Sequence, residues 1–237
     1  MSALLEVRDL DLFYGDAQAL AGVSLEVTKG EIVTIVGANG AGKSSLIRTI
    51  AGIEKARAGK IIFAGRDITG LASHHICGLG IGQVAEGRQL FPTLTTLENL
   101  QMGAMLPRAR ARVKETMNEV FHLFPRLRER RKQPAGTLSG GEQQMLAIGR
   151  CLLGCPALIM FDEPSLGLAP NIVQDVLRAI HALNQKGMTI LLVEQNVAIS
   201  LKISQHAYVL ENGRMVISGR SNELLNDDRV RQAYLGL

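Results

Sequence analysis

Residues Gly37-Ala38-Asn39-Gly40-Ala41-Gly42-Lys43-Ser44 decide the fold of this chain of 237 residues. They fit the pattern G-x-x-x-x-G-K-[ST], follow the apolar run Ile32–Val36 and precede a helical pattern over Lys43–Ala51. A strand, a glycine-rich loop and a helix in this order are typical of a phosphate-binding loop, because glycines let backbone N–H groups wrap an anion and the helix N-terminus adds a favourable dipole. We therefore expect Lys43 to reach the β- and γ-phosphates of a nucleotide and Ser44 to bind Mg²⁺.

Further apolar runs recur along the chain, and helical patterns lie between some of them. Continuous runs such as Ala157–Phe161 and Ile190–Val193 suit strands that are buried on both faces of a sheet. Strands alternating with helices predict an α/β fold with a mainly parallel sheet. The first 35 residues and Ile61–Asp67 predict short strands in a small antiparallel layer, and Leu97–Pro134 predicts a charged helical insert. The expected strands are Glu31–Val36, Lys60–Phe63, Leu158–Phe161, Thr189–Val193 and Ala207–Leu210, and the expected helices are Lys43–Ala51, Gly141–Leu153 and Ile172–Gln185.

A second motif, Leu158-Ile159-Met160-Phe161-Asp162-Glu163, places two carboxylates at the end of a buried strand. Ligands of open α/β sheets bind at the carboxyl ends of the strands, where the phosphate-binding loop also lies. We expect Asp162 to hold Mg²⁺ through water and Glu163 to polarise the attacking water as a general base. An isolated apolar run that ends in Asp-Glu would be interpreted as a strand that leads into a solvated turn. Because a phosphate-binding loop lies upstream, we prefer the interpretation as a catalytic site.

Composition excludes several other classes of protein. Apolar residues make up 46% of the chain and charged residues 20%, which indicates a globular protein rather than a disordered one. No apolar run approaches the roughly 18 residues that span a bilayer, and Met1–Asp9 does not resemble a signal peptide. Three cysteines cannot all pair, so we expect free thiols in a reducing cytoplasm. Cys151 and Cys155 lack a second pair of metal ligands and are interpreted as small buried apolar residues.

The net charge of +4 is unevenly distributed along the sequence. Arg108–Lys132 contains nine Lys or Arg and three Asp or Glu, a local excess of +6, and the other residues sum to −2. This distribution argues against a globally basic nucleic-acid-binding protein and leaves one electropositive segment to explain.

A third motif, Leu138-Ser139-Gly140-Gly141-Glu142-Gln143-Gln144, opens a predicted helix ahead of the second motif. Ser139 is a natural helix cap, and Glu142 stands three residues later, as in a capping box. Alone, this pattern predicts only a capped helix. With the two other motifs it resembles the signature of ATP-binding-cassette (ABC) ATPases, and the resemblance covers essentially the whole chain. It implies that Ser139, Gly140, Gly141 and Glu142 contact ATP held by the opposite protomer of a head-to-tail dimer.

The resemblance also assigns roles to residues outside the three motifs. Tyr14 stands where ABC proteins place an aromatic side chain against adenine, although a half-buried core tyrosine is an alternative. Glu86, rather than Gln83, aligns with the glutamine that links Mg²⁺ to the membrane partner. Gln195 replaces the usual switch histidine; it can donate a hydrogen bond to a γ-phosphate but does not titrate near neutrality. Ala169 stands where the family has an aspartate.

The resemblance thus implies a complete set of site residues. The ATP-binding set is Tyr14, Gly37, Ala38, Asn39, Gly40, Ala41, Gly42, Lys43, Ser44, Ser45 and Glu86; the catalytic set is Lys43, Glu163 and Gln195; and the metal set is Ser44, Asp162 and Glu86. The implied cofactors are ATP and Mg²⁺.

Departures from the wider family occur together and resemble one subfamily, the second ATPase of bacterial high-affinity branched-chain amino acid importers. They lie in Val84–Arg88, Gly141–Arg150, Glu163–Pro170 and Leu192–Asn196, and the tail Ala233–Gly236 fits as well. Ala85, where the subfamily usually has proline, is a small mismatch. ATPases of urea, amide or other amino acid importers are similar, so the cargo stays open between these solutes.

We expect a single ABC ATPase domain over residues 1–237, with residues 1–90 and 150–237 forming the nucleotide-binding core and residues 91–149 a helical subdomain that carries the signature. The resemblance implies a peripheral protein at the cytoplasmic face of the inner membrane. Its implied partners are a second ABC ATPase subunit in a homo- or heterodimer, two permease subunits and a periplasmic substrate-binding protein, without nucleic acid.

Two alternatives belong to other functional classes. A soluble ABC ATPase that acts on DNA would carry a long coiled-coil insertion, but only about 94 residues separate Ser44 from Ser139. Ribosome-associated members usually hold two cassettes in one chain. A regulatory module that does not hydrolyse ATP is disfavoured by the intact Lys43, Asp162 and Glu163.

The basic segment Arg108–Lys132 would face the permease and the lipid headgroups, or it would be an ordinary solvated helical face.

Overall fold

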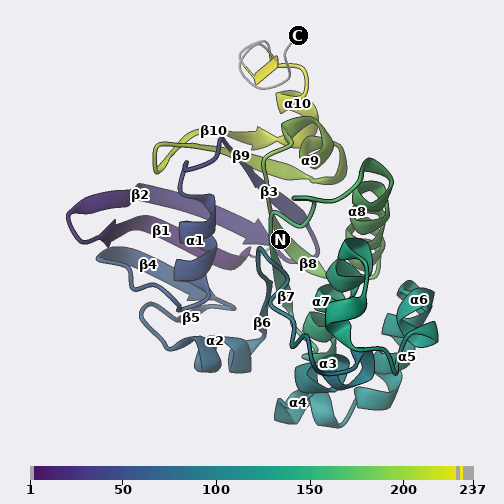
Figure 1. Cartoon of the computed structure of the whole chain (residues 1–237). Helices are drawn as coiled ribbons and strands as arrows, with labels where there is room; N and C mark the ends of the chain where they lie inside the picture. Colours follow the sequence, from purple (N-terminus) through teal and green to yellow (C-terminus); the bar gives the residue numbers. More distant parts are fainter. Residues whose placement is uncertain (1–2, 228–229, 232–237) are drawn as a thin grey trace.

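Two β-sheets and a group of helices make up the chain in the computed structural model, which describes residues 3–227 and 230–231 (Figure 1). The first sheet is antiparallel, with the strand order β2-β1-β4-β5. The second has the order β10-β9-β3-β8-β7-β6, and its strands are parallel except for β10, which pairs antiparallel with β9. The predicted α/β fold with a mainly parallel sheet and an antiparallel layer is therefore confirmed.

The strands are β1 (Ala3–Tyr14), β2 (Ala17–Thr28), β3 (Ile32–Val36), β4 (Ala58–Phe63), β5 (Arg66–Asp67), β6 (Ile81–Val84), β7 (Leu158–Asp162), β8 (Thr189–Glu194), β9 (His206–Glu211) and β10 (Arg214–Arg220). The α-helices are α1 (Lys43–Ile50), α2 (Ser73–Leu79), α3 (Thr96–Gly103), α4 (Pro107–Arg110), α5 (Val113–Leu123), α6 (Pro125–Glu129), α7 (Gly140–Leu153), α8 (Pro170–Gln185), α9 (Val197–Ile203) and α10 (Ser221–Leu224). A short 3₁₀ turn, Ala135–Thr137, precedes α7.

Two expectations about strands need correction. β1 and β2 were predicted to be short, but each is 12 residues long. The prediction was wrong because shifts of register, including those between Val7 and Leu12, interrupt the alternation that marks a strand in sequence. β10 was not predicted, since its side chains alternate between exposed and half-buried and form no continuous apolar run. The strand β6 and the helices α9 and α10 were also missed.

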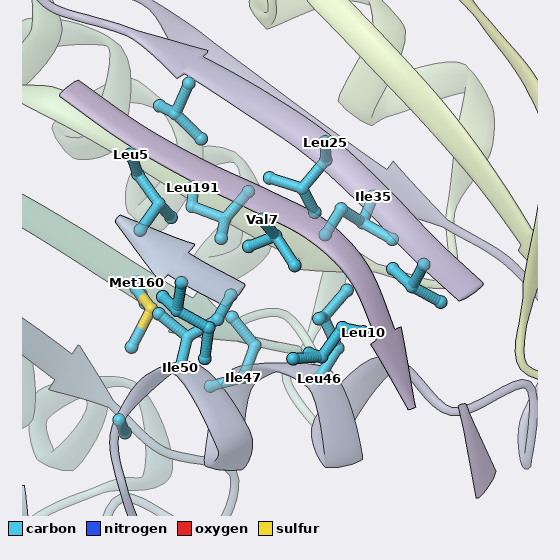
Figure 2. Packing of buried hydrophobic residues seen from close by; sticks show 14 of the residues in the cluster. Leu5, Val7, Leu10, Leu25, Ile35, Leu46, Ile47, Ile50, Met160 and Leu191 are labelled. Carbon is cyan, nitrogen blue, oxygen red and sulfur yellow. The ribbon is translucent and has the colours of Figure 1, made fainter. Parts of the chain in front are cut away.

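The continuous apolar runs of β7 and β8 are explained by burial on both faces. Leu191 of β8 and Met160 of β7 join a core with Leu5 and Val7 of β1 and with Ile47 of α1 (Figure 2). The alternate residues of the same strands lie in a second core, which also includes residues of α3, α5, α7 and α8. The parallel sheet is therefore enclosed, as expected for this class of fold.

Helices α3 to α6 occupy the stretch where the sequence predicts a charged helical insert, and α3, α5 and α6 pack on α7 (Figure 1). The packing is tight at Gly149 of α7, where a Cβ would lie 2.8 Å from Val120 and 2.9 Å from Leu100. Cys151 and Cys155 are half-buried free thiols against the same core, and Cys77 is an exposed free thiol.

The arrangement of the parallel strands positions the site. β3, β8 and β7 are neighbours and run in the same direction. The loops after these three strands therefore meet at one edge of the sheet, which is where ligands bind in such folds. No helix in residues 3–227 and 230–231 is both long and apolar enough to cross a membrane. The tail Ala233–Gly236 lies outside the described residues.

Candidate nucleotide-binding site

The phosphate-binding loop between β3 and α1 requires glycine at two points. A Cβ at Gly37 would lie 2.2 Å from the carbonyl oxygen of Leu210, and Gly42 has a φ of 105°, in the left-handed region that side chains avoid. α1 then begins at Lys43 without a side-chain cap. Its first N–H groups lack a side-chain acceptor and carry the positive end of the helix dipole, which suits an anion.

Lys43 is buried and bonded within its own chain. Its Nζ donates to the carbonyl oxygens of Gly37 and Ala38 at 2.9 and 3.0 Å and lies 3.0 Å from Oε1 of Glu163. The Lys43 side chain is 3% exposed and that of Glu163 is 10% exposed. The ammonium group thus joins the phosphate-binding loop to the carboxylate of the second motif.

Ser44 and Asp162 form an oxygen pair beside this lysine. The Ser44 hydroxyl donates to Oδ1 of Asp162 at 3.0 Å. Burial raises the pKa of Asp162, and the hydrogen bond from Ser44 offsets part of that rise. Within the described part of the chain, no group of three or more His, Cys, Asp or Glu could hold a metal ion. Mg²⁺ in nucleotide sites needs only one or two protein oxygens besides water and phosphate, so this pair fits it.

Glu163 has a strained backbone, with a φ of 46° in the left-handed region. Its N–H donates to the Val193 carbonyl of the neighbouring strand at 2.9 Å, which helps to hold that conformation. Glu163 lines two adjoining clefts, of about 660 and 560 Å³. The larger cleft also contains Lys43 and Ser44, and the smaller contains Gln195.

Tyr14 and Glu86 both line the larger cleft, together with Asn39, Gly40, Gly42 and Ser45. Tyr14 is 45% exposed, and its hydroxyl donates to Oγ of Ser45 at 3.3 Å. The alternative of a core tyrosine is therefore wrong. Gln83 lies in a different groove, so the structure separates it from the phosphate-binding loop.

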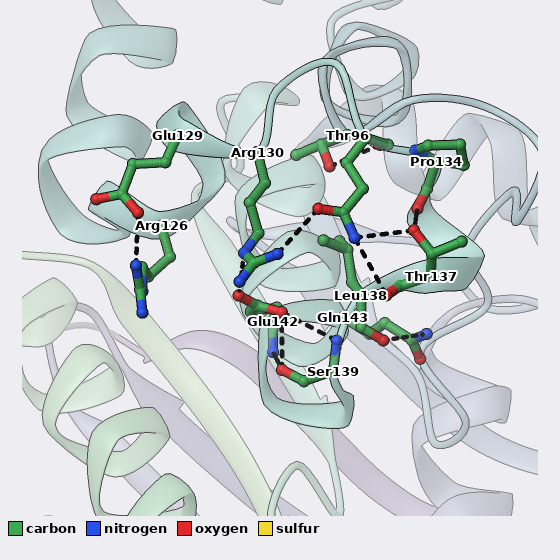
Figure 3. Close-up of polar contacts among 11 residues, drawn as sticks. Thr96, Arg126, Glu129, Arg130, Pro134, Thr137, Leu138, Ser139, Glu142 and Gln143 are labelled. Carbon is green, nitrogen blue, oxygen red and sulfur yellow. Dashed lines mark hydrogen bonds and ion pairs between the residues drawn. The ribbon is translucent and has the colours of Figure 1, made fainter.

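The third motif begins α7 with the capping box that its sequence predicts (Figure 3). Oγ of Ser139 accepts from the Glu142 N–H at 3.3 Å, and the Glu142 carboxylate accepts from the Ser139 N–H at 2.9 Å. Glu142 also contacts Arg130 at 2.6 Å. Ser139–Glu142 line neither cleft of their own chain. A Cβ at Gly141 would lie 2.6 Å from Ile172, so α7 packs closely on α8 there.

Residues 20–166 match the family model described as ABC transporter, which includes the phosphate-binding loop, the capped helix and the two carboxylates. The chain belongs to the ABC transporter family. It is an ATP-binding subunit and an ATPase of that family, as the sequence predicts.

Relatives of this ABC ATPase cover it from end to end. The high-affinity branched-chain amino acid transport ATP-binding protein BraG of Pseudomonas aeruginosa is 49% identical over 98% of this chain and 100% of its own length. A probable branched-chain amino acid transport ATP-binding protein of Archaeoglobus fulgidus is 35% identical over 99% of both. The crystal structure of an ATP-binding cassette of an ABC transporter in its ADP conformation has a TM-score of 0.85 and 32% identity, with full coverage of both chains.

One residue of the ABC site was not anticipated from the sequence. Glu194 is the last residue of β8 and is 3% exposed. Its carboxylate accepts from the N–H and the hydroxyl of Ser165, at 3.1 and 2.8 Å. The only signal in the sequence is a carboxylate that ends an apolar run directly before Gln195.

Proposed function

We propose that this chain is the ATP-hydrolysing subunit of an importer for branched-chain amino acids and works at the cytoplasmic face of the inner membrane. The observation that carries the chemistry is the meeting of Lys43, Ser44, Asp162 and Glu163 at one sheet edge. The transport substrate is inferred from the names of relatives that cover the whole chain.

In this proposal, residues of the larger cleft bind and orient ATP. Gly37–Gly42 and the N-terminus of α1 surround the phosphates with N–H donors, and Lys43 donates to the β- and γ-phosphates. The ring of Tyr14, whose hydroxyl bonds Ser45 in the same cleft, would stack on adenine. Ser44, Asp162 and Glu86 hold Mg²⁺ directly or through water, and the bound ion would neutralise charge on the phosphate oxygens.

Glu163 acts as the general base in this proposal. Its carboxylate contacts Lys43, so phosphate oxygens that attract the ammonium group would free one carboxylate oxygen for water. Glu163 lines both clefts, and Gln195 lines the smaller one. Gln195 donates to the γ-phosphate and orients it without taking up a proton.

A second ATPase subunit completes each site. Ser139–Glu142 line neither cleft of their own chain, which supports their proposed contact with ATP of an opposite protomer. Two of the relatives, both from P. aeruginosa, are named as ATP-binding proteins of branched-chain amino acid transport: BraG is 49% identical to this chain and BraF is 30% identical. We therefore favour a heterodimer in which this chain takes the BraG position.

The permease contact is proposed at a groove between α2 and the helices α3 and α4. The groove measures about 490 Å³ and includes Phe91, Met102 and Met105, which are 45%, 39% and 59% exposed. Exposed apolar side chains in one groove are typical of a protein-binding surface. Arg150 lies over the Phe91 ring and donates to the Gln89 carbonyl, which orders the loop that follows Glu86.

Transport by the assembled importer tests this function. The chain would be co-purified with its second ATPase and two permease subunits, placed in proteoliposomes with the binding protein, and assayed for ATP-driven uptake of leucine, urea and short amides. We expect leucine uptake that requires ATP. Uptake of urea or an amide alone would favour the alternative cargo, and no uptake of any amino acid would overturn the proposed substrate.

A further inference from the structure

The buried carboxylate of Glu194 has no role among the residues that the sequence motifs mark. It ends β8 directly before Gln195 and is almost completely removed from water. A carboxylate buried to this degree is costly unless hydrogen bonds satisfy it. Its function is therefore to be found in the groups that it contacts.

Both oxygens of Glu194 bind the same residue of a neighbouring loop. Oε1 accepts from the Ser165 N–H at 3.1 Å, and Oε2 accepts from the Ser165 hydroxyl at 2.8 Å. Ser165 is two residues after Glu163, in the loop that leads from β7 to α8. Each oxygen thus accepts a hydrogen bond from Ser165, and the side chain is almost completely removed from water, so a role for Glu194 as a second base is not supported.

A second contact joins the same two loops nearer the chemistry. The N–H of Glu163 donates to the Val193 carbonyl at 2.9 Å, immediately before Glu194. The loop after β7 is thus bound to the end of β8 at two points, one on each side of Pro164. Glu163 itself is strained, and such a backbone persists only when its surroundings determine it.

We infer that Glu194 is a positioning residue for ATP hydrolysis: its carboxylate holds the loop of Ser165 against the end of β8, so that Glu163 and Gln195 keep a fixed separation. The inference rests on the proposed roles of Glu163 and Gln195. Glu163, Ser165, Glu194 and Gln195 all line the smaller cleft, so a shift of either loop changes its shape. Glu194 acts only through these neighbours.

The test measures kcat and KM for ATP in the purified importer complex, and nucleotide Kd for the same variants. Glu194→Ala removes the acceptor and should lower kcat at least tenfold while KM and Kd change less than threefold. Glu194→Gln keeps one acceptor oxygen for the N–H and an amide that can donate to the hydroxyl, so it should retain at least a third of the wild-type kcat. Adding Ser165→Ala to Glu194→Ala should lower kcat less than twofold further, because both changes break the same contact.

Matched controls separate positioning from general destabilisation. Asn184 is similarly buried and donates to the carbonyls of Gly30 and Met188, away from both clefts. The Ser204 hydroxyl bonds Ser200 and Ser221, also away from both clefts. Asn184→Ala and Ser204→Ala should lower the melting temperature but leave kcat within twofold of wild type.

Three results would overturn the inference: a kcat of Glu194→Ala within twofold of wild type, no rescue by Glu194→Gln, or an equal loss of kcat in Asn184→Ala. If the importer complex that carries Glu194→Ala does not assemble, the Ser165→Ala variant alone tests the inference. It should lower kcat at least threefold and leave the nucleotide Kd unchanged. Glu163→Gln in the same assay reports separately on the proposed base, since normal turnover by that variant would reject the base and leave the measured effect of Glu194 standing.

Discussion

At the residue scale, the site depends on charged side chains that are bonded to one another inside the protein. Lys43 donates to two carbonyls and contacts Glu163, while Asp162 accepts from Ser44. These bonds hold each side chain in place. A bound nucleotide and its metal ion would replace some of these hydrogen bonds and ion pairs with contacts of their own.

The exposed ring of Tyr14 gives a prediction about nucleotide affinity. Replacing Tyr14 by Ala removes the proposed stacking surface and should weaken ATP binding by about 1–3 kcal/mol, as base–aromatic contacts do. Tyr14→Phe loses only the hydrogen bond to Ser45 and should bind ATP nearly as well as wild type. Titration with a fluorescent ATP analogue measures both. Unchanged affinity in Tyr14→Ala would remove the stacking role.

Glu194 gives a prediction about pH and stability. Burial and the nearby Glu163 charge raise the pKa of Glu194 above its usual 4.5, although hydrogen bonds from Ser165 and Gln195 partly offset the rise. The folded chain then holds this proton more tightly than the unfolded chain, so the free energy of unfolding falls as the pH rises from the usual 4.5 through the raised pKa. Glu194→Gln should therefore raise the melting temperature at pH 7.5, with a gain that shrinks as the pH approaches 4.5. Thermal unfolding between pH 5 and 8 checks this; a gain that grows towards low pH would contradict it.

The motif residues were predictable because each motif is local. Lys43 and Ser44 follow one strand, and Asp162 and Glu163 end another, so an apolar run and the next few residues suffice to identify them. The Glu194–Ser165 contact was not predictable, since its partners are 29 residues apart and meet only because β7 and β8 are neighbours. The contact of Lys43 with Glu163 was not predictable either, since it requires β3 and β7 to lie on the two sides of β8.

At the scale of elements, helix starts carry both stability and function. α3 and α7 each begin with a complete capping box, Thr95–Glu98 and Ser139–Glu142. Burial on both faces made β7 and β8 easy to predict, whereas β1 and β2 were predicted too short because changes of register break their alternation. The edge strand β10 lacks the apolar run that marks a buried strand.

The two capping boxes offer a matched experiment. Ser139→Ala and Thr95→Ala each remove a side-chain cap and should each cost about 1 kcal/mol of unfolding free energy. Only Ser139 belongs to the signature, so only Ser139→Ala should also lower ATP hydrolysis by the assembled importer. Chemical denaturation and steady-state turnover measure the two effects. Equal turnover in both variants would limit Ser139 to a helix cap.

At the scale of the whole molecule, several cations of the basic segment Arg108–Lys132 already form hydrogen bonds or ion pairs within the chain. Arg108 donates to the carbonyls of Cys77, Gly78, Gly154 and Cys155, and Arg112 pairs with Glu115. Arg126 and Arg130 pair with Glu129 and Glu142. Fewer cations than the sequence suggests are therefore available to a partner, and Arg110 and Lys114 are exposed candidates.

Charge reversal at Arg110, Arg112 and Lys114 tests whether this surface contacts the permease or anionic lipid. The combined variant should weaken assembly of the membrane complex and leave ATP binding unchanged, and Arg112 should contribute least because it is already paired with Glu115. Arg66→Glu, on the exposed strand β5, is the control and should assemble normally. Co-purification with the permease gives the result. Full assembly of the combined variant would make the segment a solvated helical face.

The proposed role of Glu163 as general base is tested most directly by turnover of the importer that carries Glu163→Gln. The substitution preserves size and removes the charge, so ATP binding should persist and closed dimers should accumulate. General bases contribute about 10²–10⁴-fold to rate, and steady-state hydrolysis should fall by at least the lower figure. Binding of ATP with wild-type affinity and nearly abolished hydrolysis is the predicted result. Normal steady-state hydrolysis by the purified variant complex would contradict the account.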